Sequence, residues 1–167
     1  MLLSTIDLIG FYGPWIQGGI NIIQLITQQY YLVGYIVFAY INIFTNKWLK
    51  IHYKEARPSA IEESGLPIKI RDPDIFGMPN ADIYGFPSGH AQQIVYSVFY
   101  LYFVKRSRFF LLLGLFLTGL TVYQRWKFKR HSITQLLAGS LIGIFIGYLG
   151  YYITSRVIKN VYAVNNI

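Results

Sequence analysis

The sequence has no cysteine and few charged residues, and both features limit what the protein can be. Only 13% of its residues are charged, whereas soluble domains usually have about 25%. The lack of cysteine excludes disulfides and thiolate-ligated metal sites. The chain begins without a basic region ahead of its first apolar residues, so the sequence does not predict a signal peptide. We therefore expect neither a disulfide-rich secreted domain nor an ordinary soluble one.

Apolar and basic residues dominate what is present. Hydrophobic residues make up 54% of the 167 residues, and aromatic residues, mostly Tyr and Phe, make up 18%. The formal net charge is +8, from 15 Lys and Arg against 7 Asp and Glu. The basic residues separate apolar runs and do not cover a soluble face. We therefore expect a bilayer and a lipid phosphate as partners, not nucleic acid. The sequence predicts no particular oligomeric state.

The apolar runs predict an all-α fold in a single domain covering residues 1–167. We expect an integral-membrane helical bundle of about five transmembrane helices plus an N-terminal interfacial helix. Its core helices are expected within residues 87–154, from apolar runs at about 88–104, 109–124 and 132–154. Short basic connectors separate these three runs.

The N-terminal 28 residues are apolar but interrupted. Asp7, Pro14 and four glycines break the run. The pattern predicts an interfacial helix to about Phe11, followed by a short membrane helix to about Thr27.

The next helix is expected from about residue 29 to Ala56, because Pro58 disfavours helical backbone in the residue before it. Residues 58–86 are rich in proline and acids and predict a long extramembrane loop. Loops of this length are usually functional or disordered. Four of its acids could bind a cation, although solvated loop acids are the commoner case: Glu62, Glu63, Asp72 and Asp74.

The stretch Pro87-Ser88-Gly89-His90 joins this loop to the next apolar run and predicts a helix start. The free N–H groups and positive dipole end of a helix form an anion site, and phosphate is the obvious ligand. A histidine in the first turn, His90, could transfer a proton to that ligand.

Alternating membrane crossings place residues 50–57, 87–90 and 125–131 at one membrane face. Lys50 and Arg57 are seven residues apart, about two helical turns, so both side chains would lie on one helix face and could bind a phosphate. The alternative is a pair of basic anchors at the membrane end.

The third stretch contains Arg125, His131 and Gln135. His131 and Gln135 are four residues apart, on one face of a helix start. A Gln carbonyl can accept a hydrogen bond from one ring nitrogen, which leaves the lone pair of the other free for attack. The alternative is a membrane-interface histidine with no catalytic task.

Taken together, Lys50-x6-Arg57-Pro58, then Pro87-Ser88-Gly89-His90, then Arg125-x5-His131 resemble the three-part signature of the type 2 phosphatidic acid phosphatase and vanadium haloperoxidase superfamily. The resemblance implies an all-α bundle that hydrolyses lipid phosphates or diphosphates without metal or other cofactor. It implies that His131 is the nucleophile that forms a phosphohistidine and that His90 protonates the leaving oxygen. The implied phosphate-binding groups are Lys50, Arg57, Arg125 and the backbone of Ser88 and Gly89.

Two positions depart from this signature. Gln124 precedes Arg125 where a serine is usual, and Gln135 occupies the position of the usual acid. The sequence is similar to the dolichyl-diphosphate phosphatase branch in carrying Gln there and in continuing with Ala91 and Gln92. This favours an active enzyme on a lipid phosphate or a polyprenyl diphosphate. The alternative is a non-catalytic membrane protein that binds lipid phosphate head groups. A vanadate-binding haloperoxidase is disfavoured, because those relatives are large and soluble.

Other residues predict packing and orientation. Asn42 and Asn46 extend the Lys50 face by fours, which is costly in a bilayer unless it faces other helices or water. His52 is expected to face away from that stripe. Small residues spaced by fours favour close helix packing on the His131 face: Gly139, Gly143 and Gly147. Basic residues at the opposite face would be cytoplasmic, which places the site on the lumenal or extracytoplasmic side of a multi-pass protein: Lys105, Arg106, Arg108, Arg156 and Lys159.

Overall fold

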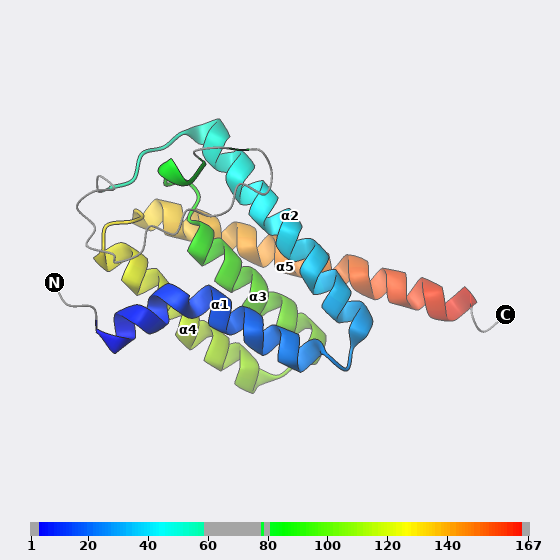
Figure 1. Ribbon diagram of the computed structural model, residues 1–167. Helices are drawn as coiled ribbons and strands as arrows, with labels where there is room; N and C mark the ends of the chain where they lie inside the picture. Colours follow the sequence, from blue (N-terminus) through cyan, green and yellow to red (C-terminus); the bar gives the residue numbers. More distant parts are fainter. Residues whose placement is uncertain (1–3, 59–77, 79–80, 165–167) are drawn as a thin grey trace.

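A computed structural model describes residues 4–58, 78 and 81–164, and within these ranges the protein has five α-helices, one short 3₁₀ helix and no strand. The all-α class is therefore confirmed. Most of the predicted loop at 58–86, including its four candidate cation-binding acids, lies outside the described residues. The elements run in the order α1 (Thr5–Leu25), α2 (Gln29–Tyr53), η2 (Ala81–Ile83), α3 (Gly89–Lys105), α4 (Arg108–Lys127) and α5 (Ile133–Val164) (Figure 1).

The N-terminal segment forms one continuous helix, so the predicted break near Phe11 is wrong. Ser4 and Asp7 form a capping box that starts α1, and Pro14 lies inside the helix. A proline there removes a backbone hydrogen bond, but α1 continues through it and packs against α4. At Gly10 an added Cβ would lie 2.5 Å from the backbone oxygen of Leu120. We attribute the continuity of α1 through Pro14 to this close packing on α4.

The second helix ends at Tyr53, three residues before the predicted end at Ala56. Lys54 takes a left-handed conformation with φ 49°, and its N–H donates to the carbonyl of Lys50 at 2.9 Å. The helix therefore ends before the position at which Pro58 would disfavour helical backbone. Glu55 and Arg57 lie on the non-helical segment that follows, which brings them beside the start of α5.

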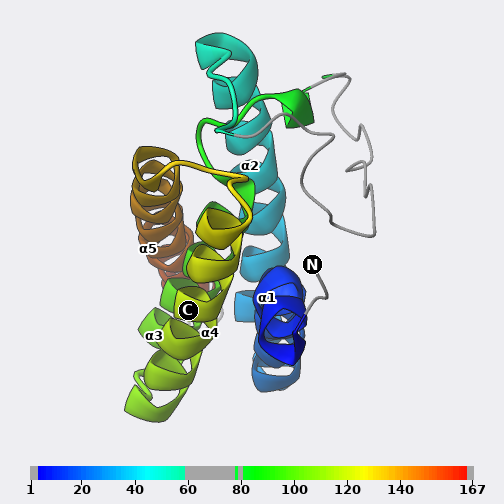
Figure 2. The same cartoon turned by 90° about the vertical axis from the view of Figure 1, so that its left-hand side faces the viewer.

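The third helix lies at the centre of the bundle and contacts each of the other four (Figure 2). Most of its length is buried, including Ile94, Tyr96, Val98 and Tyr100. A helix that is buried on nearly every side is expected at the centre of a bundle. Its N-terminus, beginning at Ser88, is therefore surrounded by the other helices.

The glycine series of α5 packs directly on α3, as predicted. An added Cβ would lie 2.5 Å from Ser88 O at Gly139, and 2.5 Å from Gln92 O at Gly143. Backbones can approach this closely only where side chains are absent. The start of α5 is thereby pressed against the start of α3.

The asparagines of α2 face α3, so this polar stripe packs against another helix, as its cost in an apolar environment requires. Asn46 Nδ2 donates to Gln92 Oε1 at 2.8 Å, and Gln92 Nε2 donates to Asn42 Oδ1 at 2.9 Å. All three side chains are buried and hydrogen-bonded. They join the end of α2 to the start of α3.

Two of the described helices, α4 and α5, are long and apolar enough to cross a membrane. The remaining helices of the predicted five-span bundle fall short of that criterion. The third is only 17 residues long, and the first two carry buried polar residues such as Asn21 and Lys47. The fifth helix extends to Val164, ten residues past the predicted end of its apolar run.

Candidate functional site

Five basic side chains from three distant stretches gather at one end of the bundle. We refer to Lys50, Arg57, His90, Arg125 and His131 as the basic cluster. Lys50, Arg125 and His131 are buried, with 4%, 6% and 2% of their surface exposed. The other four members all act electrostatically on His90. The structure thus brings together the residues that the sequence singled out at the ends of α2, α3 and α4.

Arg57 reaches the cluster by a different route from the predicted one. It lies beyond the end of α2, so it does not share a helix face with Lys50. Its Nη1 donates to the carbonyl of Arg130 at 3.2 Å and contacts Nε2 of His131 at 3.3 Å. The early end of α2 is what allows this approach.

The hydrogen bonds of His131 define its tautomer. Its Nδ1 lies 2.9 Å from the carbonyl oxygen of Gly85 and 3.2 Å from Oε1 of Gln135. Both partners are acceptors, so Nδ1 carries the hydrogen. A guanidinium can only donate, so Nε2 of His131 accepts from Arg57. The lone pair of Nε2 therefore points into the basic cluster.

The amide of Gln135 has a single orientation consistent with its neighbours. Its Nε2 donates to Oε1 of Glu55 at 2.7 Å and to the carbonyl of Ala56 at 3.0 Å. Its Oε1 accepts from the N–H of Ser132 at 3.2 Å. The oxygen must therefore face His131, as the sequence predicted. Sequence reasoning missed Glu55, because it assigned this residue to a helix.

Burial lowers the pKa of His131 well below the usual histidine value, and the charges of Arg57, Arg125 and Lys50 lower it further. The hydrogen bond that His131 donates to Gln135 raises the pKa and so acts in the opposite direction. His131 is therefore neutral at pH 7, which is the state in which Nε2 has a lone pair.

The ring of His90 packs against two aromatic side chains of α1. Its centroid lies 5.6 Å from that of Phe11 and 5.3 Å from that of Trp15. Its Nε2 is buried without a hydrogen-bond partner among the described residues. Arg125 lies over Phe11, at 5.6 Å from the ring centroid. The sequence did not predict that Phe11 and Trp15 both contact His90, because a break in α1 was expected between them. In a continuous helix, residues spaced by four lie on one face.

Ser88 makes two hydrogen bonds at the start of α3. The hydroxyl of Ser88 caps the helix by accepting from the N–H of Ala91 at 3.4 Å. The N–H of Ser88 donates to the backbone carbonyl of Gln135 at 3.0 Å, so it is already bonded within the protein. The first-turn amides of Gly89 and His90, which have no intrahelical acceptor, are the better anion donors.

The remaining histidine lies apart from the cluster. His52 is exposed and stacks on Trp48, with ring centroids 5.4 Å apart. This agrees with the prediction that it faces away. Among the residues that the structure describes, no three His, Cys, Asp or Glu side chains are grouped as a metal site.

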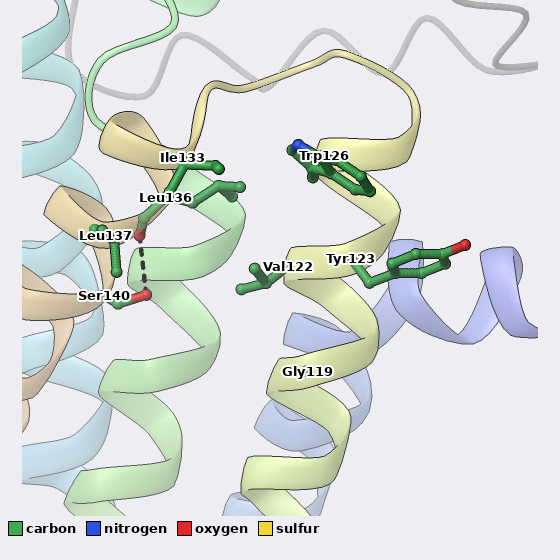
Figure 3. Close-up of a pocket in the computed structure, with 8 residues that line it drawn as sticks. All are labelled: Gly119, Val122, Tyr123, Trp126, Ile133, Leu136, Leu137 and Ser140. Carbon is green, nitrogen blue, oxygen red and sulfur yellow. Dashed lines mark hydrogen bonds between the residues drawn. The ribbon is translucent and has the colours of Figure 1, made fainter.

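A hollow of about 270 Å³ lies between α4 and α5, outside the basic cluster (Figure 3). Figure 3 shows Val122 and Leu136 facing each other across it, with Trp126 and Ile133 at one end. The Ser140 hydroxyl on its wall donates to the carbonyl of Leu136 at 2.9 Å. No charged side chain lines the hollow, so it suits an apolar group and not a phosphate. Its lining residues are Gly119, Val122, Tyr123, Trp126, Ile133, Leu136, Leu137 and Ser140.

A comparison with protein families finds a match over most of the chain. A family model described as the PAP2 superfamily matches residues 30–159, which is most of the chain and includes the whole basic cluster. No curated protein and no solved structure matches the chain. Phe11 and Trp15 lie outside the matched residues.

Proposed function

This chain belongs to the PAP2 superfamily, whose members are phosphatases, and we propose that it is an integral-membrane lipid phosphatase. The proposed reaction is hydrolysis of a lipid phosphate monoester or diphosphate through a phosphohistidine intermediate. The observation that carries the proposal is the contact between Arg57 and the lone-pair nitrogen of His131. A phosphate bound by this guanidinium would lie beside the nucleophile.

In the proposed first step, Nε2 of His131 attacks phosphorus. The N–P bond forms as the bond from phosphorus to the leaving oxygen breaks, and His90 gives its proton to that oxygen. In the second step a water oxygen attacks phosphorus as the N–P bond to His131 breaks, His90 takes a proton from that water, and inorganic phosphate leaves. The negative charge of a bound phosphate favours the protonated form of His90 that the first step needs.

The three cations of the basic cluster supply the charge stabilisation. Phosphoryl transfer depends mainly on positioning and on neutralising charge at the phosphate oxygens. Lys50, Arg57 and Arg125 are held in place by burial or hydrogen bonds. We therefore expect turnover without a metal ion or another cofactor.

The outer surfaces of α4 and α5 support a bilayer location. Only 28% and 33% of the most apolar stretch of α4 and of α5 is buried, whereas a core helix of a soluble protein is mostly buried. Several of their large apolar side chains project outward: Phe109, Leu112, Phe116, Leu141 and Phe145 are each more than 60% exposed. Bilayer lipid would cover this surface. The apolar hollow between the same helices would accommodate part of a lipid chain.

The finer assignments follow from the sequence. The resemblance to dolichyl-diphosphate phosphatases at Gln92 and Gln135 favours a polyprenyl diphosphate among the lipid substrates. The basic residues at the opposite end of the bundle favour a multi-pass topology with the basic cluster on the lumenal or extracytoplasmic side.

A second candidate is a non-catalytic membrane protein that only binds lipid phosphate heads. The observation that favours it is the neutral Gln135 in place of an acid next to the nucleophile. In that case the cluster would bind lipid phosphate without releasing it.

The test is phosphate release from phosphatidate and from a polyprenyl diphosphate by the purified protein in detergent, with a chelator present. We expect turnover of at least one lipid and its loss in His131→Ala. His52→Ala is the matched control, because that histidine is exposed and outside the cluster. Tight binding of either lipid without release would support the non-catalytic alternative.

A further inference from the structure

Glu55 contacts both groups that hold the Nδ1 side of His131. Its carboxylate Oε1 accepts a hydrogen bond from Nε2 of Gln135 at 2.7 Å. Its backbone carbonyl accepts from the N–H of Gly85 at 2.8 Å. Gly85 and Gln135 then present their oxygens to Nδ1 of His131, at 2.9 and 3.2 Å. One residue therefore holds both acceptors.

The charge of Glu55 changes what the Gln135 amide can do. An amide N–H that donates to a carboxylate makes a charge-assisted hydrogen bond, which is stronger than a neutral one. Hydrogen bonds in such a chain polarise one another by about 10–30% each. The oxygen of Gln135 therefore becomes a better acceptor for the Nδ1 hydrogen than an isolated amide would be.

We propose that Glu55 is a positioning residue that acts on His131 through Gln135 and Gly85. It supplies a negative charge one amide away from the ring, in a chain that lacks a carboxylate at position 135. When Nε2 attacks, the ring becomes positively charged, and the polarised amide stabilises that charge. The inference rests on the proposed function, in which His131 is the nucleophile.

The cations that act on His131 oppose a positive ring. Lys50 belongs to α2, Arg57 to the segment after it, and Arg125 to α4. His90 begins α3, and the half-buried Arg130 precedes the histidine in the chain. Against this positive surrounding, loss of the Glu55 charge should shift the titration of His131 to lower pH.

The first variant is Glu55→Gln, which keeps the size of the side chain and an oxygen that can accept from Gln135, but removes the charge. We expect kcat to fall by about 10–100-fold, by analogy with the loss of a hydrogen-bond partner that orients a metal-ligating histidine. Since His131 must be neutral to attack, the acid limb of the pH profile of kcat/KM should move to lower pH. A residue that only supported the fold would lower kcat without moving this limb.

The second variant exchanges the two side chains, as Glu55→Gln combined with Gln135→Glu. The carboxylate then contacts His131 directly and the amide stands behind it. We expect the acid limb to lie at higher pH than that of the wild type. We also expect kcat to exceed that of Gln135→Glu alone, because two carboxylates face each other in that variant. Unchanged rate and unchanged acid limb in Glu55→Gln would overturn the inference.

A measurement without turnover separates this inference from the proposed function. Nitrogen-15 NMR of histidine-labelled protein in detergent should show the Nδ1–H tautomer of His131 and a lower titration midpoint in Glu55→Gln. The exposed His52 gives an internal control that should not shift. An unshifted His131 midpoint would refute the role of Glu55. A shifted midpoint in a protein that releases no phosphate from any lipid would refute the proposed function and leave the positioning role standing.

Discussion

Nε2 of His131 lies 3.3 Å from Nη1 of Arg57, although 74 residues separate them in the chain. The contact joins the segment that follows α2 to the connection between α4 and α5. Because Arg57 can only donate, it meets the nitrogen that carries the lone pair. The proposed phosphate-binding group and the proposed nucleophile are thus side by side, and most of the predictions below follow from this arrangement.

The cations should matter for turnover and not only for membrane anchoring. Arg57→Ala and Arg125→Ala should each reduce kcat/KM by about 10²–10³-fold, the usual cost of removing one charge-stabilising donor. Vanadate, a phosphate mimic, should inhibit the wild type and inhibit both variants less. Arg156→Ala is the control, since this arginine is near the far end of α5 and contacts Tyr152. Full activity of both cluster variants would mean that these cations serve only as membrane anchors.

The two cluster histidines should have different effects. His131→Ala should abolish turnover and any trapped phospho-enzyme, because no other group replaces the attacking nitrogen. His90→Ala should slow substrates with alcohol-like leaving groups most, since these need the proton. It should slow diphosphates less, because their leaving phosphate is already a stable anion. Equal slowing of both substrate classes would argue against His90 as the acid.

The pH profile should report on His131. Its pKa is below the usual value of about 6.5, so the wild type should keep its activity as the pH falls through that value. Activity should be lost only at the lower pH where the ring gains a proton. Gln135→Asp adds an opposite charge, which raises the pKa of His131 and moves the acid limb to higher pH.

Gln135→Leu removes the acceptor that orients the ring. We expect it to lose most of the rate, by about 10–100-fold. Steady-state kinetics of purified Leu and wild-type proteins give the comparison. If the two proteins turn over equally, the amide has no part in the reaction.

The apolar hollow should select for the lipid chain. An added Cβ at Gly119 meets nothing within 4 Å, so Gly119→Leu can fill the hollow without straining the fold. It should raise KM for long-chain substrates and leave short, water-soluble phosphates unaffected. Gly19→Leu on α1 is a matched control, because its Cβ also meets nothing. An unchanged preference for chain length would place the lipid chain elsewhere.

The close packing of α5 on α3 should be sensitive to a single methyl group. Gly143→Ala would put Cβ 2.5 Å from the backbone oxygen of Gln92. Relieving that overlap requires a backbone shift, which typically costs about 1–3 kcal/mol. Thermal unfolding in detergent should show a lower midpoint than for Gly19→Ala. Equal midpoints would mean that the two helices can separate at little cost.

Local signals in the sequence were enough for the helices and for the ends at which they meet. The apolar runs predicted α3, α4 and α5, and Ser88 caps α3 where the Pro-Ser-Gly-His stretch predicted a helix start. Spacing by four predicted that Gln135 would accept from His131 and that the glycines of α5 would pack closely. These features depend on residues within a few positions of each other, or on one helix face.

The errors have a common origin in long-range packing. Pro14 predicted a break, but the fit of Gly10 against α4 keeps α1 continuous. That continuity places Phe11 and Trp15 together against the ring of His90. No local pattern indicates which distant helix will compensate for a lost hydrogen bond.

The sequence by itself determined the helical class, the positions of the core helices and the basic residues at their ends, because capping and periodicity act over one or two turns. The tertiary structure decided how those ends are used. It brings Glu55 and Arg57, which follow the end of α2 at Tyr53, beside Gln135 and His131. It bonds the N–H of Ser88 to Gln135 and connects Glu55 to His131 through an amide. The Ser88–Gln135 and Glu55–Gln135 contacts join residues 47 and 80 positions apart, and only the packing of α2, α3 and α5 brings them within hydrogen-bonding distance.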